Sequence, residues 1–480
     1  MAYIRKVKTG SGAIAVQLVR KEHGRVVVIK HLGSAHNQQE EHLLCDLAKQ
    51  RLYQNQLSLL AEFDQSKLKL KSSSSTLLKK VLWEQYQRLG FDSLHDQIFA
   101  YLCIARIVEP TSKLDSLRVL SDLGVTGLDK NQLYRCLRKV VANNYRQTIS
   151  QLCFNYASQG NLGLILYDVT TLYFEIQHED EYRKPGLSKE RRLEPQIVIG
   201  LLVNQGGFPL DLTSFEGNTV ETKTILPVIR KFCDQYQVQN VTVVADAAML
   251  SEQNLKTISE AGCSYVVGSR LTKIPYDIVE YQKDKRLSDG QIVESKTGKH
   301  RVIYQYREKR AALDLKNIEK QITKAERVVA GKTSVSRARF LTIKANSKQI
   351  NYKLIEKAKA LVGIKGYVTN LNVPGQEIID YYHQLFQVEK SFRMTKSDFK
   401  ARPIFHRKRD SIEAHLTIVL AALAIGRHIE SQTRMSIKQL VKTLRPIRSG
   451  VVIINNQEYT AEPELPSFIH TLLQKLQPGH

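Results

Sequence analysis

The sequence of 480 residues has little cysteine and no long hydrophobic run. Its six cysteines include no CxxC pair and no spacing typical of metal ligands, so we expect reduced, buried thiols rather than disulfides or zinc sites. The N-terminus lacks the apolar segment of a signal peptide. The longest apolar run, 416–426, is about half of the ~20 residues that a membrane span needs. These absences predict a cytoplasmic protein that does not enter a membrane.

Acidic residues are scarce relative to basic ones. The chain has 47 Asp and Glu against 71 Lys and Arg, which gives a formal net charge of +24. Solubility does not require so large an excess of basic residues. The excess favours a polyanion, most simply nucleic acid, as the partner. A basic enzyme with solvated lysines is the alternative. With 42% hydrophobic and 25% charged residues, the composition is globular and excludes a wholly disordered or collagen-like chain.

The hydrophobic pattern divides the chain into six segments. They are predicted to be an N-terminal β-rich segment with a helix, a helical region, a first α/β part, an insertion, a second α/β part and a C-terminal region: 1–70, 71–158, 159–270, 271–365, 366–430 and 431–480. A basic, serine-rich run at 67–80 is predicted to be a linker or a loop. Within the insertion, 309–330 is expected to be helical.

Two helices in the helical region resemble a helix-turn-helix. The second, 130–141, follows a glycine turn, and Asp129 is placed to cap it. It carries Arg135, Arg138 and Lys139, side chains of the kind that recognition helices place against phosphates and base edges. Ordinary bundle helices share this pattern, so both interpretations remain open.

Two aspartates follow strands that are predicted to be buried on both faces. Asp168 comes directly after the apolar run 164–167, and Asp246 directly after 241–245. Ligands bind at the carboxyl ends of strands in open α/β sheets, so these side chains could face each other across adjacent strands. A turn or helix cap is the alternative for each aspartate. It fits Asp246 poorly, because Ser251 is better placed to cap the next helix.

A third carboxylate lies on a predicted long helix, 376–396. One face of that helix is formed at steps of three and four by Ile378, Tyr382, Leu385, Glu389, Phe392 and Lys396. The face is apolar apart from Glu389 and Lys396. An unpaired carboxylate on a core-facing stripe costs several kcal/mol, so Glu389 needs a metal ion or a cation. An ion pair with Arg393 or Lys396 is the alternative.

Two Asp and one Glu supply only oxygen ligands, which suit Mg²⁺ or Mn²⁺ better than zinc. Two such ions can activate a water or a DNA 3′-hydroxyl and stabilise the leaving oxygen of phosphoryl transfer. The basic segment after the helix, with Lys400, Arg402 and Arg407, is expected to contact DNA, and a solvated face is its alternative. His406 and His415 are interpreted as hydrogen-bonded structural residues rather than metal ligands.

These motifs resemble the DDE transposases of bacterial insertion sequences, and among them the insertion sequence 4 superfamily. That superfamily has a helix motif, Y-x2-[RL]-x3-E-x6-K, which is matched here by Tyr382, Leu385, Glu389 and Lys396. The segments around Asp168 and Asp246 resemble its first and second aspartate motifs. Leu385 stands where relatives more often have Arg, so one phosphate contact is expected to be missing or supplied elsewhere.

The resemblance implies an α/β protein with an RNase H-like catalytic core. A mostly β insertion would precede the glutamate helix, and a helical DNA-binding region and an N-terminal β segment would precede the core. Asp168, Asp246 and Glu389 would be catalytic and hold Mg²⁺, with Mn²⁺ as a substitute. Tyr382 and Lys396 are expected to contact the DNA backbone, and Arg393 joins this set by its place on the same helix.

The resemblance also implies an activity. Such enzymes bind double-stranded DNA, cut at the terminal inverted repeats of an element and join its 3′ ends to target DNA. They act as homodimers in a synaptic complex, in a bacterial or archaeal cytoplasm. Two alternatives remain: an RNase H-like nuclease or resolvase that cuts without joining, and a DNA-binding protein with a decayed core. Use of a DNA hairpin intermediate stays open.

Overall fold

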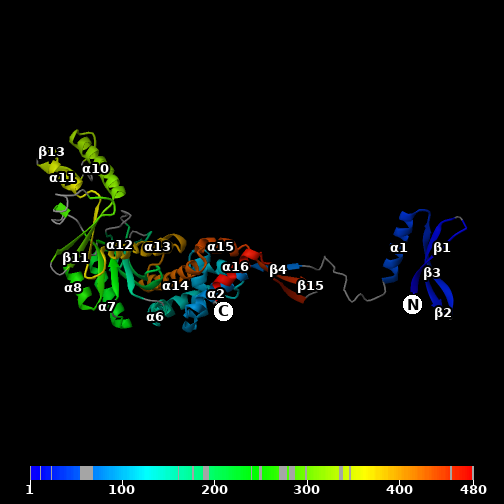
Figure 1. Cartoon of the computed structure of the whole chain (residues 1–480). Coiled ribbons are helices and arrows are strands. Elements are labelled where there is room, and N and C mark those ends of the chain that lie inside the picture. The colour runs from blue at the N-terminus through cyan, green and yellow to red at the C-terminus, as the bar shows by residue number, and fades with distance from the viewer. Residues whose placement is uncertain are drawn as a thin grey trace. The chain divides into compact units, whose positions relative to one another are not determined.

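The computed structural model describes most of the chain (Figure 1). The described residues are 2–10, 12–22, 24–53, 69–159, 162–175, 178–186, 194–238, 241–247, 251–269, 278–279, 287–297, 300–334, 339–344, 347–454 and 457–477. They form two compact units. Unit 1 is Met1–Ser72 with Val451–Ala461, and unit 2 is Ser73–Gly450 with Glu462–His480.

The N-terminal part of unit 1 is an antiparallel sheet in the order β1–β2–β3, covered by one helix. Its elements are β1 (Ala2–Lys8), β2 (Ile14–Glu22), β3 (Arg25–Ala35) and α1 (Gln38–Tyr53). Val16 of β2 and Cys45 and Ala48 of α1 form its small core. The strands and the helix expected here from the sequence are therefore present.

A second three-stranded sheet has the order β16–β15–β4. Its strands are β4 (Lys69–Ser74), β15 (Ser449–Ile454) and β16 (Gln457–Ala461). The predicted linker or loop at 67–80 is wrong over its described part, because β4 is a strand and helix α2 begins at Thr76. The side chains of β4 are mostly polar and give no sign of a strand. The strand forms because its main chain pairs with β15, which is distant in the sequence. Residues 67 and 68 lie outside the described residues.

The helical region of unit 2 packs around α14 (Arg409–Thr433). The other helices of this part are α2 (Thr76–Arg88), α3 (Gln97–Val108), α4 (Ser116–Asp122), α5 (Lys130–Ala142), α6 (Tyr145–Ser158), α15 (Ile437–Leu444) and α16 (Ser467–Leu476), with a 3-10 turn at Phe91–Leu94. Within the described residues, α14 is the one helix long and apolar enough to cross a membrane, and 94% of its apolar window is buried inside the protein. Such burial is typical of a core helix.

Eight strands within the described residues form one mixed sheet in the order β10–β11–β14–β9–β8–β5–β6–β7. They are β5 (Leu164–Tyr173), β6 (Gln196–Asn204), β7 (Pro209–Glu216), β8 (Thr242–Ala245), β9 (Ser264–Ser269), β10 (Ile292–Thr297), β11 (His300–Tyr306) and β14 (Ile364–Thr369). β5, β8 and β9 are parallel neighbours, and the other pairs are antiparallel. The predicted α/β class is confirmed, and β6 and β7 form an antiparallel hairpin.

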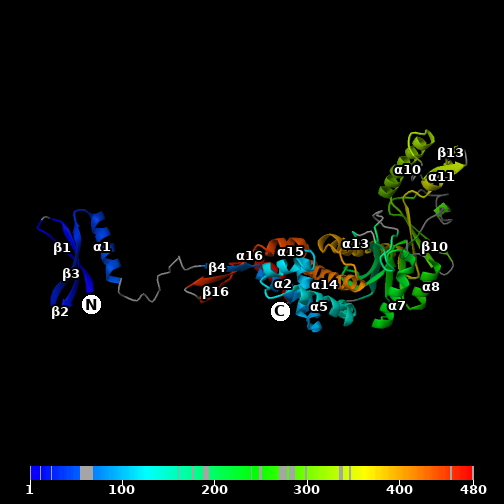
Figure 2. The same ribbon diagram turned by 180° about the vertical axis from the view of Figure 1, so that it is seen from behind.

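Helices cover both faces of this sheet. α7 (Ile225–Tyr236), preceded by a 3-10 turn at Glu221–Lys223, packs beside α8 (Glu252–Glu260), and Figures 1 and 2 show both below the sheet. α12 (Gly375–His383) and α13 (Phe386–Arg393) lie above it. As predicted, Ser251 caps α8, its side chain accepting a hydrogen bond of 3.1 Å from the Asn254 backbone N–H.

The expected mostly β insertion is wrong within its described residues. It contains α10 (Glu308–Val329), α11 (Tyr352–Ala360) and a small hairpin, β12 (Leu341–Lys344) with β13 (Ser347–Ile350). α10 alone has 22 residues, which confirms the helix expected at 309–330. β10 and β11 belong to the main sheet instead, because β11 pairs with β14. We call the segment between β11 and β14, residues 307–363, the α10–α11 lobe.

The predicted long helix 376–396 is interrupted. α12 ends at His383, α13 begins at Phe386, and a π-helix, Met394–Asp398, follows. The interruption changes the direction of the helical face. Ile378, Tyr382 and Phe392 are buried, but Glu389 is exposed rather than held in the core.

Candidate active site

Three carboxylates line one cavity of about 350 Å³ in unit 2. Asp168 comes from β5, Asp246 from the end of β8 and Glu389 from the first turn of α13. Lys365, Tyr382, His383, Leu385 and Phe386 complete the lining. The fold thereby places side chains that are more than 200 residues apart in the sequence around the same cavity.

The two aspartates occupy equivalent places on adjacent parallel strands. Tyr167 of β5 is the partner of Ala245 of β8, and Asp168 and Asp246 each follow directly after this last pair. The expectation of adjacent strands is confirmed. The predicted end of the first strand at residue 167 is wrong, since β5 continues to Tyr173 and Asp168 pairs within it with Leu201 of β6.

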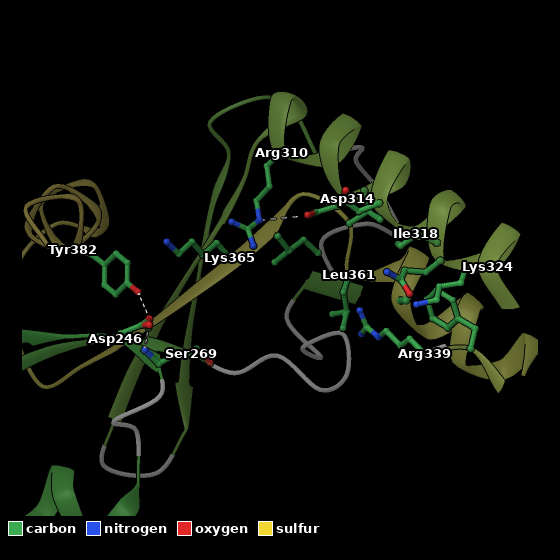
Figure 3. Close-up of a pocket in the computed structure, with 18 residues that line it drawn as sticks. Asp246, Ser269, Arg310, Asp314, Ile318, Lys324, Arg339, Leu361, Lys365 and Tyr382 are labelled. Atoms are coloured by element: carbon green, nitrogen blue, oxygen red, sulfur yellow. Dashed lines mark hydrogen bonds and ion pairs between the residues drawn. The ribbon is translucent and has the colours of Figure 1, made fainter. Parts of the chain in front are cut away.

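Asp246 is fixed by two hydrogen bonds. Its Oδ1 accepts one of 3.0 Å from the hydroxyl of Tyr382 and one of 2.7 Å from the backbone N–H of Ala247 (Figure 3). Burial, together with the charge of Asp246, raises the pKa of Tyr382, so its hydroxyl stays protonated and remains a donor. The tyrosine that the sequence assigned to DNA therefore holds a carboxylate in this structure.

Lys365 is a cation in the cavity that the sequence did not indicate. Its Nζ lies 4.3 Å from the centre of the Tyr382 ring, which is a cation–π contact. Burial and then Arg310 lower the pKa of Lys365, while Asp246 and Glu389 oppose this shift. β14 places Lys365 here by pairing with β9, so the only local signal is a lysine at the start of a buried strand.

Lys396 lies beside the strand that carries the first aspartate. Its Nζ donates a hydrogen bond to Oγ1 of Thr170, two residues after Asp168 on β5. Arg393 is exposed on α13, and Glu389 lines the cavity.

The β6–β7 turn holds α13 in place. Gly207 has a φ of +81°, and its carbonyl oxygen accepts hydrogen bonds of 2.7 Å from Ser391 Oγ and of 3.1 Å from Arg427 Nε. A Cβ atom at Gly207 would lie 2.2 Å from the Arg427 guanidinium, so only glycine fits this turn. Ser391 is two residues from Glu389, and the turn therefore helps to position this carboxylate.

The other residues predicted to contact DNA lie in two places. Arg135 and Arg138 are exposed on α5, and Lys400 and Arg407 are exposed after the π-helix. Arg402 lies over the ring of Tyr173, 5.6 Å from its centre.

Lys139 of α5 has a structural partner. Its Nζ lies 3.3 Å from Oδ2 of Asp96, whose side chain is 7% exposed. α5 packs on α3 and α14 and is capped by Asp129, as predicted, through a complete capping box with Gln132. The helix is a bundle member whose remaining basic side chains face solvent.

A second cavity of about 1030 Å³ adjoins the first and shares Asp246, Lys365 and Tyr382 with it. Its far side is formed by the α10–α11 lobe, which contributes Arg310, Lys324 and Arg339 (Figure 3). Arg310 is partly neutralised, because its Nε lies 3.5 Å from Asp314 Oδ2. The carboxylate site thus opens towards a polar, largely basic wall.

The donor set suits a divalent metal ion. All three carboxylates are oxygen ligands of the type that Mg²⁺ and Mn²⁺ prefer, and they border one cavity. In the described residues, no three His, Cys, Asp or Glu side chains are already gathered as a metal-binding cluster. The residue types fit the ion, and the three carboxylates line a cavity that has room for it.

A family model described as a transposase DDE domain matches residues 161–425, a range that includes all three carboxylates. The chain belongs to this family of DDE transposases. The insertion sequence 4 superfamily is the typical home of the family, in agreement with the resemblance noted in the sequence. All six cysteines of this DDE transposase are free and buried, as predicted.

Similarity to solved structures is weaker. A piggyBac transposase synaptic complex with hairpin DNA matches with 14% identity and a TM-score of 0.41, over 78% of this chain and 79% of that chain. Argonaute of Marinitoga piezophila with a 5′ OH guide RNA matches with 10% identity and a TM-score of 0.22, over 80% of this chain and 67% of that one. No curated protein matches the chain. The assignment therefore rests on the family match and the site.

Proposed function

We propose that this DDE transposase binds the terminal inverted repeats of an insertion sequence, cleaves at the element ends and joins the 3′ ends to target DNA. The observation that carries the proposal is the single cavity bordered by Asp168, Asp246 and Glu389. All three lie within the matched transposase DDE domain, two at strands and one on a helix, which supports the proposal.

We further propose that β5 to β9 form an RNase H-like core. The strand order β7–β6–β5–β8–β9, in which β6 alone runs opposite to the other four strands, supports this assignment because it is the strand order of that fold. In such a core the two aspartates lie on the central parallel pair, and the glutamate helix covers the same edge.

Asp168, Asp246 and Glu389 would hold Mg²⁺ or Mn²⁺, and the bound metal would supply activation of the attacking hydroxyl and stabilisation of the leaving oxygen. The chain's own groups have separate tasks. Tyr382 orients Asp246, and Lys365 places a positive charge beside the carboxylates, where a phosphate would enter. Lys396 contacts the strand of the first aspartate through Thr170 and would also meet the DNA backbone.

The larger cavity is the proposed path of the DNA away from the cleaved bond. Arg310, Lys324 and Arg339 form its basic wall, and each cation that meets a phosphate releases counter-ions and raises affinity. The proposed contacts for the rest of the substrate are exposed residues: Arg135, Arg138, Arg393, Lys400 and Arg407. Joining of two ends would engage two copies of the chain, in the cytoplasm of a bacterial or archaeal host.

The test uses the DNA that flanks the gene as substrate, with Mg²⁺ or Mn²⁺ and a plasmid as target. Wild type is compared with Glu389→Gln, which keeps the size of the side chain and removes its charge. Glu260→Gln on α8, whose partner is Lys256 at 3.7 Å, is the matched control. We expect border-specific nicks and joined products with wild type and the control, and neither with Glu389→Gln.

Two results would support other functions. Cutting without border preference or joining would indicate a nuclease or resolvase. Specific binding of the borders with no metal-dependent cleavage would indicate a DNA-binding protein with a decayed core. Full activity of Glu389→Gln would place the active site elsewhere.

A further inference from the structure

A third cavity, of about 630 Å³, lies where the segment after the π-helix meets the helical region of unit 2. Its basic and imidazole side chains come from both parts: Arg106, Lys113, Lys400, Arg402, His406 and His415. Sequence reasoning assigned only two of them, Lys400 and Arg402, to DNA. The other four come together because α3, α14 and two loops meet at this point.

Two of these cations are almost fully buried. The exposed fraction is 7% for Arg106 and 5% for Lys113. Lys113 Nζ lies 3.2 Å from Nδ1 of His415, while Nε2 of the same ring lies 3.2 Å from the carbonyl oxygen of Ala401. With its Nε2 donating to that carbonyl, His415 is neutral and offers Lys113 a lone pair but no negative charge.

No Asp or Glu is present among the described residues that line this cavity. The charges that act on its groups are mainly positive. Burial and then Arg106 lower the pKa of Lys113 well below its usual value, and burial, Lys113 and Arg106 lower the pKa of His406 to about 4. Burying unpaired positive charge costs several kcal/mol, and a negative ligand would offset that cost.

We propose that this cavity binds a phosphate group of the DNA backbone. Lys113 and Arg106 would form charge-assisted hydrogen bonds to its oxygens from the buried side, and Lys400 and Arg402 would approach from the rim. The inference rests on the proposed function for its ligand, since transposase substrates are DNA. Inorganic phosphate has the same chemistry and is the other source that the experiment distinguishes.

The cavity has a defined place relative to the carboxylates. Ile404, which lines it, forms a bridge with Phe174, and the Ile404 N–H donates a hydrogen bond of 3.1 Å to the carbonyl oxygen of Tyr173. Phe174 follows β5, the strand that carries Asp168, so the cavity and the first aspartate are joined through one strand.

The first experiment measures thermal unfolding of the full chain with increasing inorganic phosphate at constant ionic strength. Phosphate is expected to raise the Tm of wild type. Lys113→Met keeps the length of the side chain and removes its buried charge, so it should have an equal or higher Tm without phosphate and no response to it. Lys256→Met, at an exposed lysine of α8, is the matched control and should respond like wild type.

The second experiment measures binding of element-end DNA without divalent metal over a range of salt. Lys113→Met is expected to weaken binding about tenfold and to reduce the slope of log affinity against log salt by about one. Single methylphosphonate replacements in the DNA locate the contact. The replacement at the contacted phosphate should weaken binding by wild type and leave binding by Lys113→Met unaffected.

Several outcomes would overturn the proposal. An equal phosphate response in wild type and Lys113→Met would place phosphate elsewhere. A lower Tm of the variant with unchanged DNA binding would make Lys113 and His415 a purely structural pair. Loss of the phosphate response with unchanged DNA affinity and salt slope would assign the cavity to free phosphate and reject the DNA contact. Absence of border-specific cleavage would reject the transposase proposal separately, since the phosphate response does not depend on it.

Discussion

The hydroxyl of Tyr382 donates a hydrogen bond of 3.0 Å to Oδ1 of Asp246. α12 thereby fixes the orientation of a carboxylate on β8, across the cavity that both residues line. Tyr382 is 7% exposed, and β9 makes room for it at Gly268, where a Cβ atom would lie 2.8 Å from its hydroxyl. The contact makes Tyr382 a positioning residue for the carboxylate site.

Tyr382→Phe removes this hydrogen bond and keeps the aromatic contact with Lys365. A hydrogen bond to a charged group contributes about 1.5–3 kcal/mol, so we expect cleavage to slow by roughly ten- to a hundredfold. Single-turnover cleavage and DNA binding are measured together, and the Mg²⁺ concentration for half-maximal rate should rise. Weaker DNA binding at an unchanged cleavage rate would contradict the positioning role and restore the direct DNA contact.

Lys396 and Thr170 offer a way to separate a structural contact from a DNA contact. Thr170→Val removes the acceptor, and Lys396→Met removes the donor together with its charge. If Lys396 meets a phosphate, only the lysine variant should reduce the salt slope of end binding, by about one, with a roughly tenfold loss of affinity. Equal losses in the two variants would mean that Lys396 acts only by supporting β5.

The basic wall of the α10–α11 lobe should contribute to binding rather than to chemistry. The double variant Lys324→Ala and Arg339→Ala is expected to lower DNA affinity and to reduce the salt slope by about two. Lys316→Ala, at an exposed site on α10 outside the described cavities, is the control. A slope that falls equally in the control would show that the lobe acts only through its total charge.

His428 predicts a pH dependence of stability. Burial lowers its pKa from 6.5 to about 4, and the ring is neutral between Tyr156, 2.8 Å from Nδ1, and Gln85, 3.1 Å from Nε2. Above pH 6.5, His428 is neutral in both the folded and the unfolded chain. Its contribution to the free energy of unfolding is then fully present. As pH falls from 6.5 towards 4, only the unfolded chain takes up the proton, so the free energy of unfolding decreases by roughly 3 kcal/mol.

Urea unfolding at several pH values between 4 and 7.5 measures this dependence. His428→Gln should show a shallower decrease than wild type, because Gln can satisfy both neighbours without titrating. His470→Gln, at an exposed site on α16, is the control and should follow wild type. Parallel curves for wild type and His428→Gln would assign the acid sensitivity to other groups.

The parts of the site that the sequence predicted depend on local pattern. The apolar run before Asp246 is a buried strand, and Ser251 caps the helix after it. β5 was predicted too short because Thr170 and Thr171 look like loop residues, yet they are buried at 4% and 8% exposure within the sheet. The sequence does not indicate which polar side chains are buried inside a central strand.

Other parts depend on contacts between distant segments. No proline or glycine marks the break between α12 and α13, so helical spacing alone gave Glu389 a core position that it does not have. Lys365 reaches the cavity through pairing of β14 with β9, and Lys113 meets His415 across 302 residues. Local periodicity contains no information on such contacts.

The pairing of β11 with β14 has a consequence for how the α10–α11 lobe is attached. Tyr306 and Ile364 are direct partners across these strands, so the chain leaves the sheet and returns to it at neighbouring points, about 5 Å apart. The lobe is thus a β-hairpin turn expanded to residues 307–363. A short turn could replace the lobe without removing any strand of the eight-stranded sheet, and the three carboxylates lie outside it.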